Sequence, residues 1–380
     1  MKVTIAIDSL KGSLSSLEAG DAIGQGVKKA WPEAEVCVRP LADGGEGTVE
    51  AVVSAMGGKN VTLSVTGPLG TPVDCVYGVI EKSQTAVLEM AGAAGLPLLK
   101  DEERNPMLTT TYGVGEVIRD AVRRGCRHFL VGIGGSATND GGVGMLQALG
   151  FGMLDEQGRQ VPFGAQGLEA LRRIEDRDVM PELKECTFRI ACDVTNPLCG
   201  PQGCSAVYGP QKGADEEMIA RMDKWMEAYG ALTEAKYPGI DSKTPGCGAA
   251  GGIGFAFYAF LHGSLESGIK IVLEETRLAD YVKDADIVVT GEGRLDGQTV
   301  MGKAPIGVAR TAKQYGKKVI AFSGSVTKDA IACNAGGIDA FFPILRRIVT
   351  LEEAMDPQTA RENMTDTSEQ VFRLLRACRI

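Results

Sequence analysis

Apolar positions along the chain follow two different spacings, and these spacings alternate at the start of the sequence. Val3–Ile7 is a short apolar run that predicts a buried strand, and the spacing from Ser16 to Ala30 predicts a helix that Pro32 ends. Glu35–Arg39 alternates like a second strand, and Thr48–Met56 returns to helical spacing. The beginning of the chain therefore predicts strand, helix, strand and helix.

The same alternation returns in the last third of the chain. Ile287–Val289, Val319–Phe322 and Ala340–Pro343 are apolar runs typical of buried strands, and helical spacing is found near Ile306–Tyr315 and Thr367–Ala377. Strands that alternate with helices predict a parallel sheet with helices on both faces.

The middle of the chain has a different pattern. Val61–Val65, Val73–Ile80 and Ala86–Glu89 are short alternating runs with Gly and Pro between them, which predicts antiparallel hairpins. Tyr112–Arg124 has helical spacing, and Phe129–Ile133 predicts another buried strand. A mixture of hairpins and helices indicates a second structural region.

These patterns predict an α/β protein with a doubly wound, Rossmann-like parallel-sheet domain and a second α/β lobe. A chain of 380 residues exceeds the size of one ordinary core, which also favours two domains. We expect a discontinuous first domain made of residues 1–60, 105–150 and 268–380. We expect the second lobe to comprise residues 61–104 and 151–267.

Composition and charge narrow the classes of function. The net charge of −9 argues against nucleic acid or a membrane as a partner, and no apolar run reaches the ~18 residues of a membrane span. Asp8 interrupts the apolar segment that a secretion signal would need, so we expect a cytoplasmic location. The ten cysteines contain no C-x-x-C pair, and we expect them to be reduced thiols. With only two histidines, acid–base chemistry falls to aspartate, glutamate or lysine.

Glycines, small hydroxyl residues and acids gather where the predicted strands end. Of the 380 residues 50 are glycine, close to twice the usual ~7%. Ligands of a doubly wound sheet bind outside the carboxyl ends of its strands, where glycines let backbone N–H groups approach an anion and carboxylates suit Mg²⁺. The predicted strand exits carry, in chain order, Asp8 and Lys11, Asp43 and Glu46, Ser136 to Asp140, Asp193 to Asn196, Glu292 to Asp296, and Ser323 to Ser325.

Three glycine motifs match known nucleotide-binding patterns only in part. Gly132–Ala137 fits G-x-G-x-x-A but has no acid at the end of a second strand about twenty residues later, and Gly246–Gly251 fits G-x-G-x-x-G without a preceding strand. Gly297–Lys303 matches a P-loop except that Ala304 lacks the hydroxyl that would hold Mg²⁺. A P-loop ATPase is therefore rejected, and a dinucleotide fold is weakly supported.

Seven longer motifs, in this order, resemble the bacterial glycerate kinase type I family. They are DSLKGSLSS, PLADGGEGT, GIGGSATNDGG, ACDVTNPLCG, YGPQKGA, PGCGAAGG and TGEGRLDGQTVMGKAP. The resemblance covers nearly the whole chain; Leu10 and Leu41 stand where many relatives have Phe and Met. It implies ATP-dependent phosphorylation of D-glycerate with Mg²⁺, usually to 2-phosphoglycerate, by two α/β lobes with the active site in the cleft between them.

Phosphoryl transfer needs positioning, charge neutralisation and a base, and the resemblance suggests residues for each role. Arg294 is expected to clamp the glycerate carboxylate and Lys11 to contact the phosphates, while either Asp193 or Asp296 is the base or a metal ligand. Expected catalytic residues are Asp193, Lys11 and Asp296; substrate-binding residues are Arg294, Glu292, Gly291 and Asp8; nucleotide-binding residues are Asp43, Gly44, Gly45, Gly134, Gly135, Ser136, Asn139 and Asp140; metal ligands are Asp193 and Asp296.

Three alternatives to a glycerate 2-kinase remain at this point. They are phosphorylation of the other glycerate hydroxyl, an NAD-dependent glycerate or hydroxypyruvate oxidoreductase that uses the G-x-G-x-x-A segment, and a non-catalytic glycerate sensor. The sequence does not distinguish the two enantiomers of glycerate, assign base and metal ligand among the aspartates, or decide whether the protein is a homo-oligomer.

Overall fold

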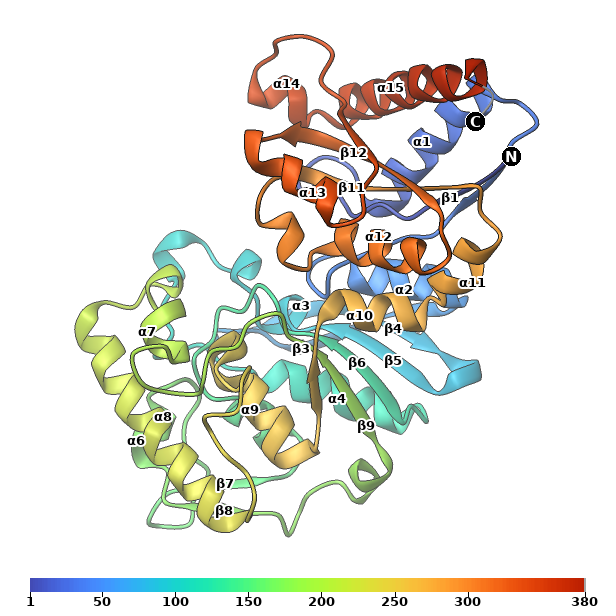
Figure 1. Ribbon diagram of the computed structural model, residues 1–380. Helices are drawn as coiled ribbons and strands as arrows, with labels where there is room; N and C mark the ends of the chain where they lie inside the picture. The colour runs from blue at the N-terminus through green and yellow to red at the C-terminus, as the bar shows by residue number, and fades with distance from the viewer. Residues whose placement is uncertain (379–380) are drawn as a thin grey trace. The chain divides into compact units, whose positions relative to one another are not determined.

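The computed structural model describes residues 1–378, and the described chain divides into two compact units (Figure 1). Unit 1 contains Met1–Asp43, Glu50–Met56 and the chain from Ile269 onward. Unit 2 contains Gly44–Val49 and Gly57–Gly268. Each unit has its own sheet and hydrophobic core, so each is described by itself.

In the described part of unit 1, five parallel strands form one sheet in the order β13-β12-β11-β1-β2. The strands are β1 (Lys2–Ile5), β2 (Glu35–Val38), β11 (Ile287–Leu295), β12 (Lys318–Val326) and β13 (Ala340–Pro343). Numbered within the unit, this is the 2-1-3-4-5 order of doubly wound folds, in which the chain changes direction across the sheet between the first and third strands. In unit 1 that switch point lies between the neighbouring strands β1 and β11.

Helices cover both faces of the unit 1 sheet (Figure 1). The helices of this part of the chain are α1 (Ser16–Ala30), α10 (Gly268–Glu275), α11 (Leu278–Lys283), α12 (Ala304–Gln314), α13 (Ala332–Ala335), α14 (Leu351–Met355) and α15 (Pro357–Ala377), while α2 (Thr48–Met56) begins in unit 2. Helices α1 and α15 lie side by side on one face and α12 packs on the other. A Cβ atom on Gly26 would lie 2.0 Å from Ser368 Oγ, so glycine permits this close helix contact.

The described part of unit 2 has a mixed six-stranded sheet in the order β10-β9-β6-β5-β4-β3 and a two-stranded sheet of β7 and β8. The strands are β3 (Lys59–Thr66), β4 (Pro72–Ile80), β5 (Thr85–Glu89), β6 (His128–Gly132), β7 (Gly152–Leu154), β8 (Arg173–Glu175), β9 (Thr187–Ala191) and β10 (Ser264–Glu266). The helices are α3 (Ala91–Ala94), α4 (Tyr112–Arg123), α5 (Val143–Ala148), α6 (Gly167–Ala170), α7 (Cys204–Tyr208), α8 (Glu216–Lys236) and α9 (Ala249–Leu261).

The predicted hairpins are confirmed, because β3 pairs with β4 and β4 with β5 in antiparallel fashion. The predicted placement of residues 105–150 in the first domain is wrong, because β6 pairs with β5 and β9 of unit 2. Phe129 of β6 stacks on Phe188 of β9, with ring centroids 4.7 Å apart. An apolar strand pattern indicates burial but not which of two cores the strand enters, and this led to the error.

Candidate functional site

A cavity of about 450 Å³ lies at the carboxyl ends of β1 and β11 in unit 1, where the doubly wound sheet has its switch point. Acidic and basic side chains line one part of it. The acids are Asp8, Asp43, Glu292 and Asp296, and the cations are Lys11, Arg294 and Lys303. Ligands of doubly wound sheets bind at this position, so the sheet topology and the chemistry of the side chains indicate the same site.

The first side of the cavity is formed where the chain leaves β1. The backbone N–H of Asp8 donates to the carbonyl of Gly291 at 2.9 Å, which joins the ends of β1 and β11. A Cβ atom on Gly291 would lie only 1.8 Å from the carbonyl oxygen of Phe322, so no side chain fits there. Gly291, predicted to bind substrate, therefore has a clear role in bringing the strands together.

Asp8 is a buried carboxylate in this cavity, and its Oδ1 accepts the N–H of Ser9 at 2.7 Å. Burial raises the pKa of Asp8 to about 7, and the negative charges of Asp43 and Glu292 act in the same direction. The charge of Lys11 and the Ser9 hydrogen bond oppose this rise in the pKa only partly. A carboxylate with a pKa near neutrality can release and accept a proton under physiological conditions.

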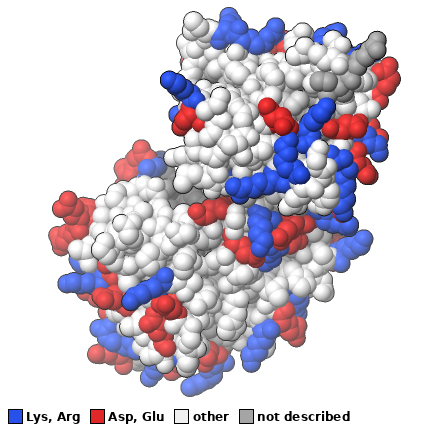
Figure 2. Space-filling model, in the orientation of Figure 1, with Lys and Arg blue, Asp and Glu red and all other residues white. Residues whose placement is uncertain are grey.

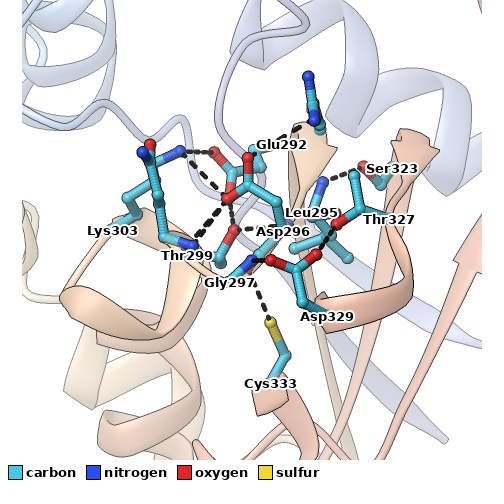
Figure 3. A network of polar contacts seen from close by, with 12 residues as sticks. Glu292, Leu295, Asp296, Gly297, Thr299, Lys303, Ser323, Thr327, Asp329 and Cys333 are labelled. Carbon is cyan, nitrogen blue, oxygen red and sulfur yellow. Dashed lines mark hydrogen bonds and ion pairs between the residues drawn. The ribbon is translucent and has the colours of Figure 1, made fainter. Parts of the chain in front are cut away.

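The second side of the cavity is formed by β11 and the turn that follows it. Figure 3 shows Glu292, Asp296, Thr299 and Lys303 turned toward one another. Glu292 Oε1 accepts the Thr299 hydroxyl at 2.7 Å, while Lys303 Nζ lies 3.8 Å from Glu292 Oε2 and 3.9 Å from Asp296 Oδ1. Burial raises the pKa of Glu292, and the Thr299 hydrogen bond and the Lys303 charge oppose that rise.

Hydrogen bonds hold this turn in one shape. Asp296 Oδ1 accepts the backbone N–H groups of Gln298 at 2.9 Å and Thr299 at 3.3 Å. Asp329 Oδ2 accepts the N–H of Gly297 at 3.1 Å and shares the network seen in Figure 3. Asp296 therefore has a structural task in addition to any role in binding.

Arg294 and Lys11 are the more exposed cations of the site. The Arg294 side chain is 65% exposed and its Nε lies 3.6 Å from Asp296 Oδ2; Lys11 is 60% exposed and its Nζ lies 3.8 Å from Asp43 Oδ2. Exposed ion pairs of this kind contribute only ~0–1 kcal/mol, so an arriving anion can compete with them. The sequence predicted a strand that ends at Val289 and an exit containing Arg294, but β11 continues through Leu295 and Arg294 pairs in register with Ser325 of β12. The expectation of a loop at Arg294 is therefore wrong.

Asp193, a predicted catalytic and metal-binding residue, is placed in unit 2, and Asp296 belongs to unit 1. Asp193 is exposed after β9, and its Oδ1 accepts the backbone N–H of Gly268 at 3.2 Å, where α10 begins. Within residues 1–378, no group of three or more His, Cys, Asp or Glu side chains is arranged to hold a metal ion. Mg²⁺ that arrives with phosphates needs only one or two protein carboxylates, so the carboxylates of the unit 1 cavity fit that mode of binding.

The predicted nucleotide-binding residues fall into two groups. Asp43 lines the unit 1 cavity, whereas the others belong to unit 2. Gly44 has φ +93°, and a Cβ atom there would lie 2.5 Å from Ala191 Cβ, so it serves close packing. The carbonyl of Gly45 accepts the N–H of Thr48 at 3.3 Å. Gly134 and Gly135 are exposed after β6.

Ser136, Asn139 and Asp140 are buried within unit 2. The Asp140 carboxylate accepts the N–H and hydroxyl of Thr111, both at 2.8 Å, and the N–H groups of Gly142 and Gly144. Burial raises the pKa of Asp140, and these hydrogen bonds oppose that rise. Asn139 donates to Ser205 Oγ at 2.9 Å. In this structure Asn139 and Asp140 hold the interior of unit 2 together, so the geometry gives their prediction as nucleotide ligands no support.

Sequence reasoning missed two lysines. Lys303 lines the cavity and ends the near-match to a P-loop that was rejected for its last position. Lys212 lies in the YGPQKGA motif, is 1% exposed, and donates from Nζ to Ser136 Oγ at 2.8 Å and to the Thr138 carbonyl at 2.6 Å. Burial lowers the pKa of Lys212 to about 8. The near P-loop and the lysine within a glycine motif were the signals that could have identified them.

The sheet order and the charged site define an α/β protein with a ligand site at the switch point of a doubly wound sheet. The chain belongs to the glycerate kinase family, whose model matches residues 3–376, and it is an enzyme. This confirms the resemblance seen in the motifs.

Relatives match the chain along almost its whole length. It is 46% identical over 375 residues to the glycerate kinase of Haemophilus influenzae, covering 99% of each chain, and 46% identical over 372 residues to the glycerate 2-kinase of Escherichia coli K12, covering 98% of this chain and 97% of that one. A crystal structure assigned as glycerate kinase 2 from Salmonella typhimurium LT2 has a TM-score of 0.92 and 47% identity, covering 100% of this chain and 99% of that one.

Two further observations concern the surface. In the described residues, no helix is long and apolar enough to cross a membrane. On the face drawn in Figure 2, basic and acidic side chains are interspersed.

Proposed function

We propose that the protein transfers the γ-phosphoryl group of ATP to the 2-hydroxyl of D-glycerate, giving 2-phosphoglycerate and ADP, with Mg²⁺ bound to ATP as part of that substrate. The observation that carries the proposal is the unit 1 cavity, which brings cations and carboxylates together at the switch point of the sheet. The name of the Escherichia coli relative at 46% identity supports the 2-hydroxyl as the acceptor.

The cations of the cavity divide between the two anionic substrates. Arg294 presents a planar guanidinium that can bind the glycerate carboxylate through two parallel hydrogen bonds. Lys11 and Lys303 are point charges that suit phosphate oxygens, and each now faces a carboxylate 3.8 Å away. Asp296 and Asp43 are the carboxylates of the cavity that we assign to the Mg²⁺ of the nucleotide.

Asp8 is the carboxylate best suited to act as the base. The ideal base has a pKa near the working pH, and burial brings the pKa of Asp8 to about 7. Asp296 Oδ1 fixes the turn after β11 by accepting the N–H groups of Gln298 and Thr299, and Asp193 Oδ1 accepts the N–H of Gly268 in unit 2. Asp8 would accept the proton of the glycerate hydroxyl as the new oxygen–phosphorus bond forms and the bond from the γ-phosphorus to the β–γ bridging oxygen breaks.

The alternative activities have weaker support. An NAD-dependent oxidoreductase would need the G-x-G-x-x-A segment to open a helix, but α5 begins only at Val143, beyond Ala137. A sensor would need no base and no phosphate-binding cations, whereas the cavity contains a carboxylate with a pKa near 7. Phosphorylation at the 3-hydroxyl uses the same residues and differs only in how glycerate is oriented.

A ³¹P NMR spectrum of the product from ATP, Mg²⁺ and D-glycerate tests the proposal. We expect the resonance of 2-phosphoglycerate to grow as the γ-phosphate resonance of ATP declines. A 3-phosphoglycerate resonance would contradict the assigned hydroxyl, and an unchanged ATP signal would contradict the kinase activity. L-Glycerate under the same conditions tests the preferred enantiomer, and oxidation of NADH with hydroxypyruvate tests the oxidoreductase alternative.

A further inference from the structure

The unit 1 cavity is much larger than glycerate and has a second, apolar wall. Its volume of about 450 Å³ lies in the range of ~300–1,000 Å³ that encloses drug-sized ligands, whereas glycerate is a small polar anion. Apolar side chains also line this cavity, and most of them come from residues 344–355. They are Leu10, Ile344, Leu345, Leu351, Ala354 and Met355.

This wall is formed by α14, the segment before it and the turn after β1. Leu10 and Ile344 are buried, so the base of the wall belongs to the core of unit 1. Leu351 is 79% exposed and Met355 is 38% exposed, so both present apolar surface at the cavity that the core does not use. Thr350 and Glu353 form a capping box that fixes the start of α14, the helix that carries Leu351 and Met355.

The apolar wall adjoins the residues expected to contact phosphate. A Cβ atom on Gly12 would lie 2.8 Å from Met355 Cε, so the turn that carries Lys11 packs directly against Met355. A ligand that extends from this wall to Lys11 would have an apolar end and an anionic end. Glycerate has no apolar end, but a nucleoside triphosphate has a flat base at one end and phosphates at the other.

We propose that the wall formed by Leu10, Ile344, Leu351 and Met355 binds the base and ribose of the phosphoryl donor, with its phosphates directed to Lys11. This inference rests on the proposed kinase function and adds to it the nucleoside subsite, which lies in unit 1. The base gains by displacing water from Leu351 and Met355, whose exposed surface it covers. The acids and Arg294 of the same cavity remain available for Mg²⁺ and for glycerate.

Calorimetric titration of the full chain with two probes tests the proposal. The first probe is ATP with Mg²⁺, and the second is inorganic tripolyphosphate with Mg²⁺, which has the phosphates but no base. The double variant Leu351→Ala/Met355→Ala removes the exposed part of the wall without adding charge. Leu374→Ala on α15 is the matched control, because Leu374 is 61% exposed and does not line the cavity.

We expect the double variant to raise the Kd of ATP roughly tenfold, because apolar contact area is lost, and to leave the Kd of tripolyphosphate within about twofold. The Leu374→Ala variant should bind both probes like the unchanged protein. An unchanged Kd for ATP, or an equal weakening of both probes, would overturn the inference. Circular dichroism of the double variant shows whether the fold is retained, and Leu351→Ala alone, which truncates only an exposed side chain, gives the same test if it is not.

The outcome of this experiment is independent of the test of catalysis. If the protein binds ATP through the wall but leaves glycerate unphosphorylated, the proposed function fails and the nucleoside subsite stands. If glycerate is phosphorylated and the double variant binds ATP normally, the nucleoside subsite fails and the proposed function stands.

Discussion

Two groups of polar residues follow strands in this protein, one in each unit, and they have opposite environments. In unit 1, the residues after β1 and at the end of β11 line an open cavity in which Lys11 and Arg294 are more than half exposed. In unit 2, the residues from Ser136 to Asp140 lie inside the protein around the 1% exposed Lys212. Both groups contain aspartate and small hydroxyl residues and have glycines next to them in the sequence, so these residue types alone do not separate a ligand site from an internal polar network.

The difference comes from which groups satisfy the charged atoms. Asp140 is surrounded by N–H and hydroxyl donors of its own chain, and Lys212 by a hydroxyl and a carbonyl, so both meet the requirement for a buried charge to be hydrogen-bonded. In the unit 1 cavity the ion pairs of Lys11, Arg294 and Lys303 have N–O distances of 3.6 Å or more, longer than a good hydrogen bond. Long, partly exposed pairs are the ones that a ligand can replace.

The largest expected effect comes from removing the base. Asp8→Asn should lower kcat by ~10²–10⁴, because the amide cannot accept the hydroxyl proton. Asp193→Asn is the matched change in unit 2, and we expect a much smaller loss of kcat because Asp193 is hydrogen-bonded to the start of α10. Steady-state kinetics of both variants, with ATP and glycerate at saturation, compares them. If Asp193→Asn is the more damaging change, the base belongs to unit 2 and the assignment of Asp8 fails.

The pKa of Asp8 also predicts how the rate and the stability depend on pH. Since the base must be ionised, kcat/KM should fall about tenfold per pH unit below about 7 and level off above it. Stability should change in the opposite sense. The folded protein holds the Asp8 proton up to about pH 7, whereas the unfolded chain releases it near 3.8, so the free energy of unfolding should decrease as the pH rises through that interval.

Urea unfolding at pH 5 and pH 8 measures this second effect, and Asp8→Asn is the comparison. The variant should be stabilised relative to the unchanged protein at pH 8, by up to roughly 4 kcal/mol for a shift of about three pKa units. An unfolding free energy that differs equally at the two pH values would show that the pKa of Asp8 is not raised.

In unit 2 the expected loss is one of stability. Asp140→Ala leaves the N–H groups of Thr111, Gly142 and Gly144 without their acceptor inside the protein, which should cost about 3 kcal/mol or more. Thermal unfolding measures the change, with Glu156→Ala as control, because Glu156 is exposed in an ion pair of 3.9 Å. A variant that keeps its stability and loses only affinity for ATP would restore Asp140 as a nucleotide ligand.

The sequence was sufficient to predict the alternating strands and helices of unit 1, the hairpins β3–β4–β5 and the gathering of Asp8, Lys11, Glu292, Arg294 and Asp296. Strand exits in a doubly wound sheet converge by topology, so local patterns were enough there. Three features could not be predicted in this way. The sheet that β6 joins, the burial of Asp140 and the apolar wall at Leu351 depend on contacts between segments far apart in the chain, which a local pattern does not contain.

Substitution of Arg294 tests whether the exposed polar residues of the unit 1 cavity form a binding site. Arg294→Lys keeps the charge but loses the planar pair of donors. We therefore expect kcat/KM for glycerate to fall roughly 30-fold, which corresponds to a loss of ~2 kcal/mol of transition-state stabilisation. The KM of ATP and the thermal stability should barely change, because the pair with Asp296 is exposed. Arg310→Lys on α12 is the control for a surface arginine. An unchanged kcat/KM would leave the glycerate carboxylate without an assigned partner.

The smallest expected effect is at Lys11, whose position at the rim of the cavity makes it a weak contributor to both folding and binding. Its ion pair with Asp43 spans 3.8 Å with the lysine 60% exposed, so Lys11→Ala should change the free energy of unfolding by less than ~1 kcal/mol. The ammonium acts on phosphate as a point charge that water partly screens, so the KM of ATP should rise by roughly three- to tenfold while the KM of glycerate stays within about twofold.

Lys28→Ala, which removes an exposed lysine from the last turn of α1, controls for a change in overall charge. Because screening grows with salt, the difference between the Lys11 and control variants in the KM of ATP should shrink as the ionic strength rises. If instead the KM of glycerate rises and that of ATP does not, Lys11 holds the acceptor, and the two ends of the cavity must be assigned in the opposite order.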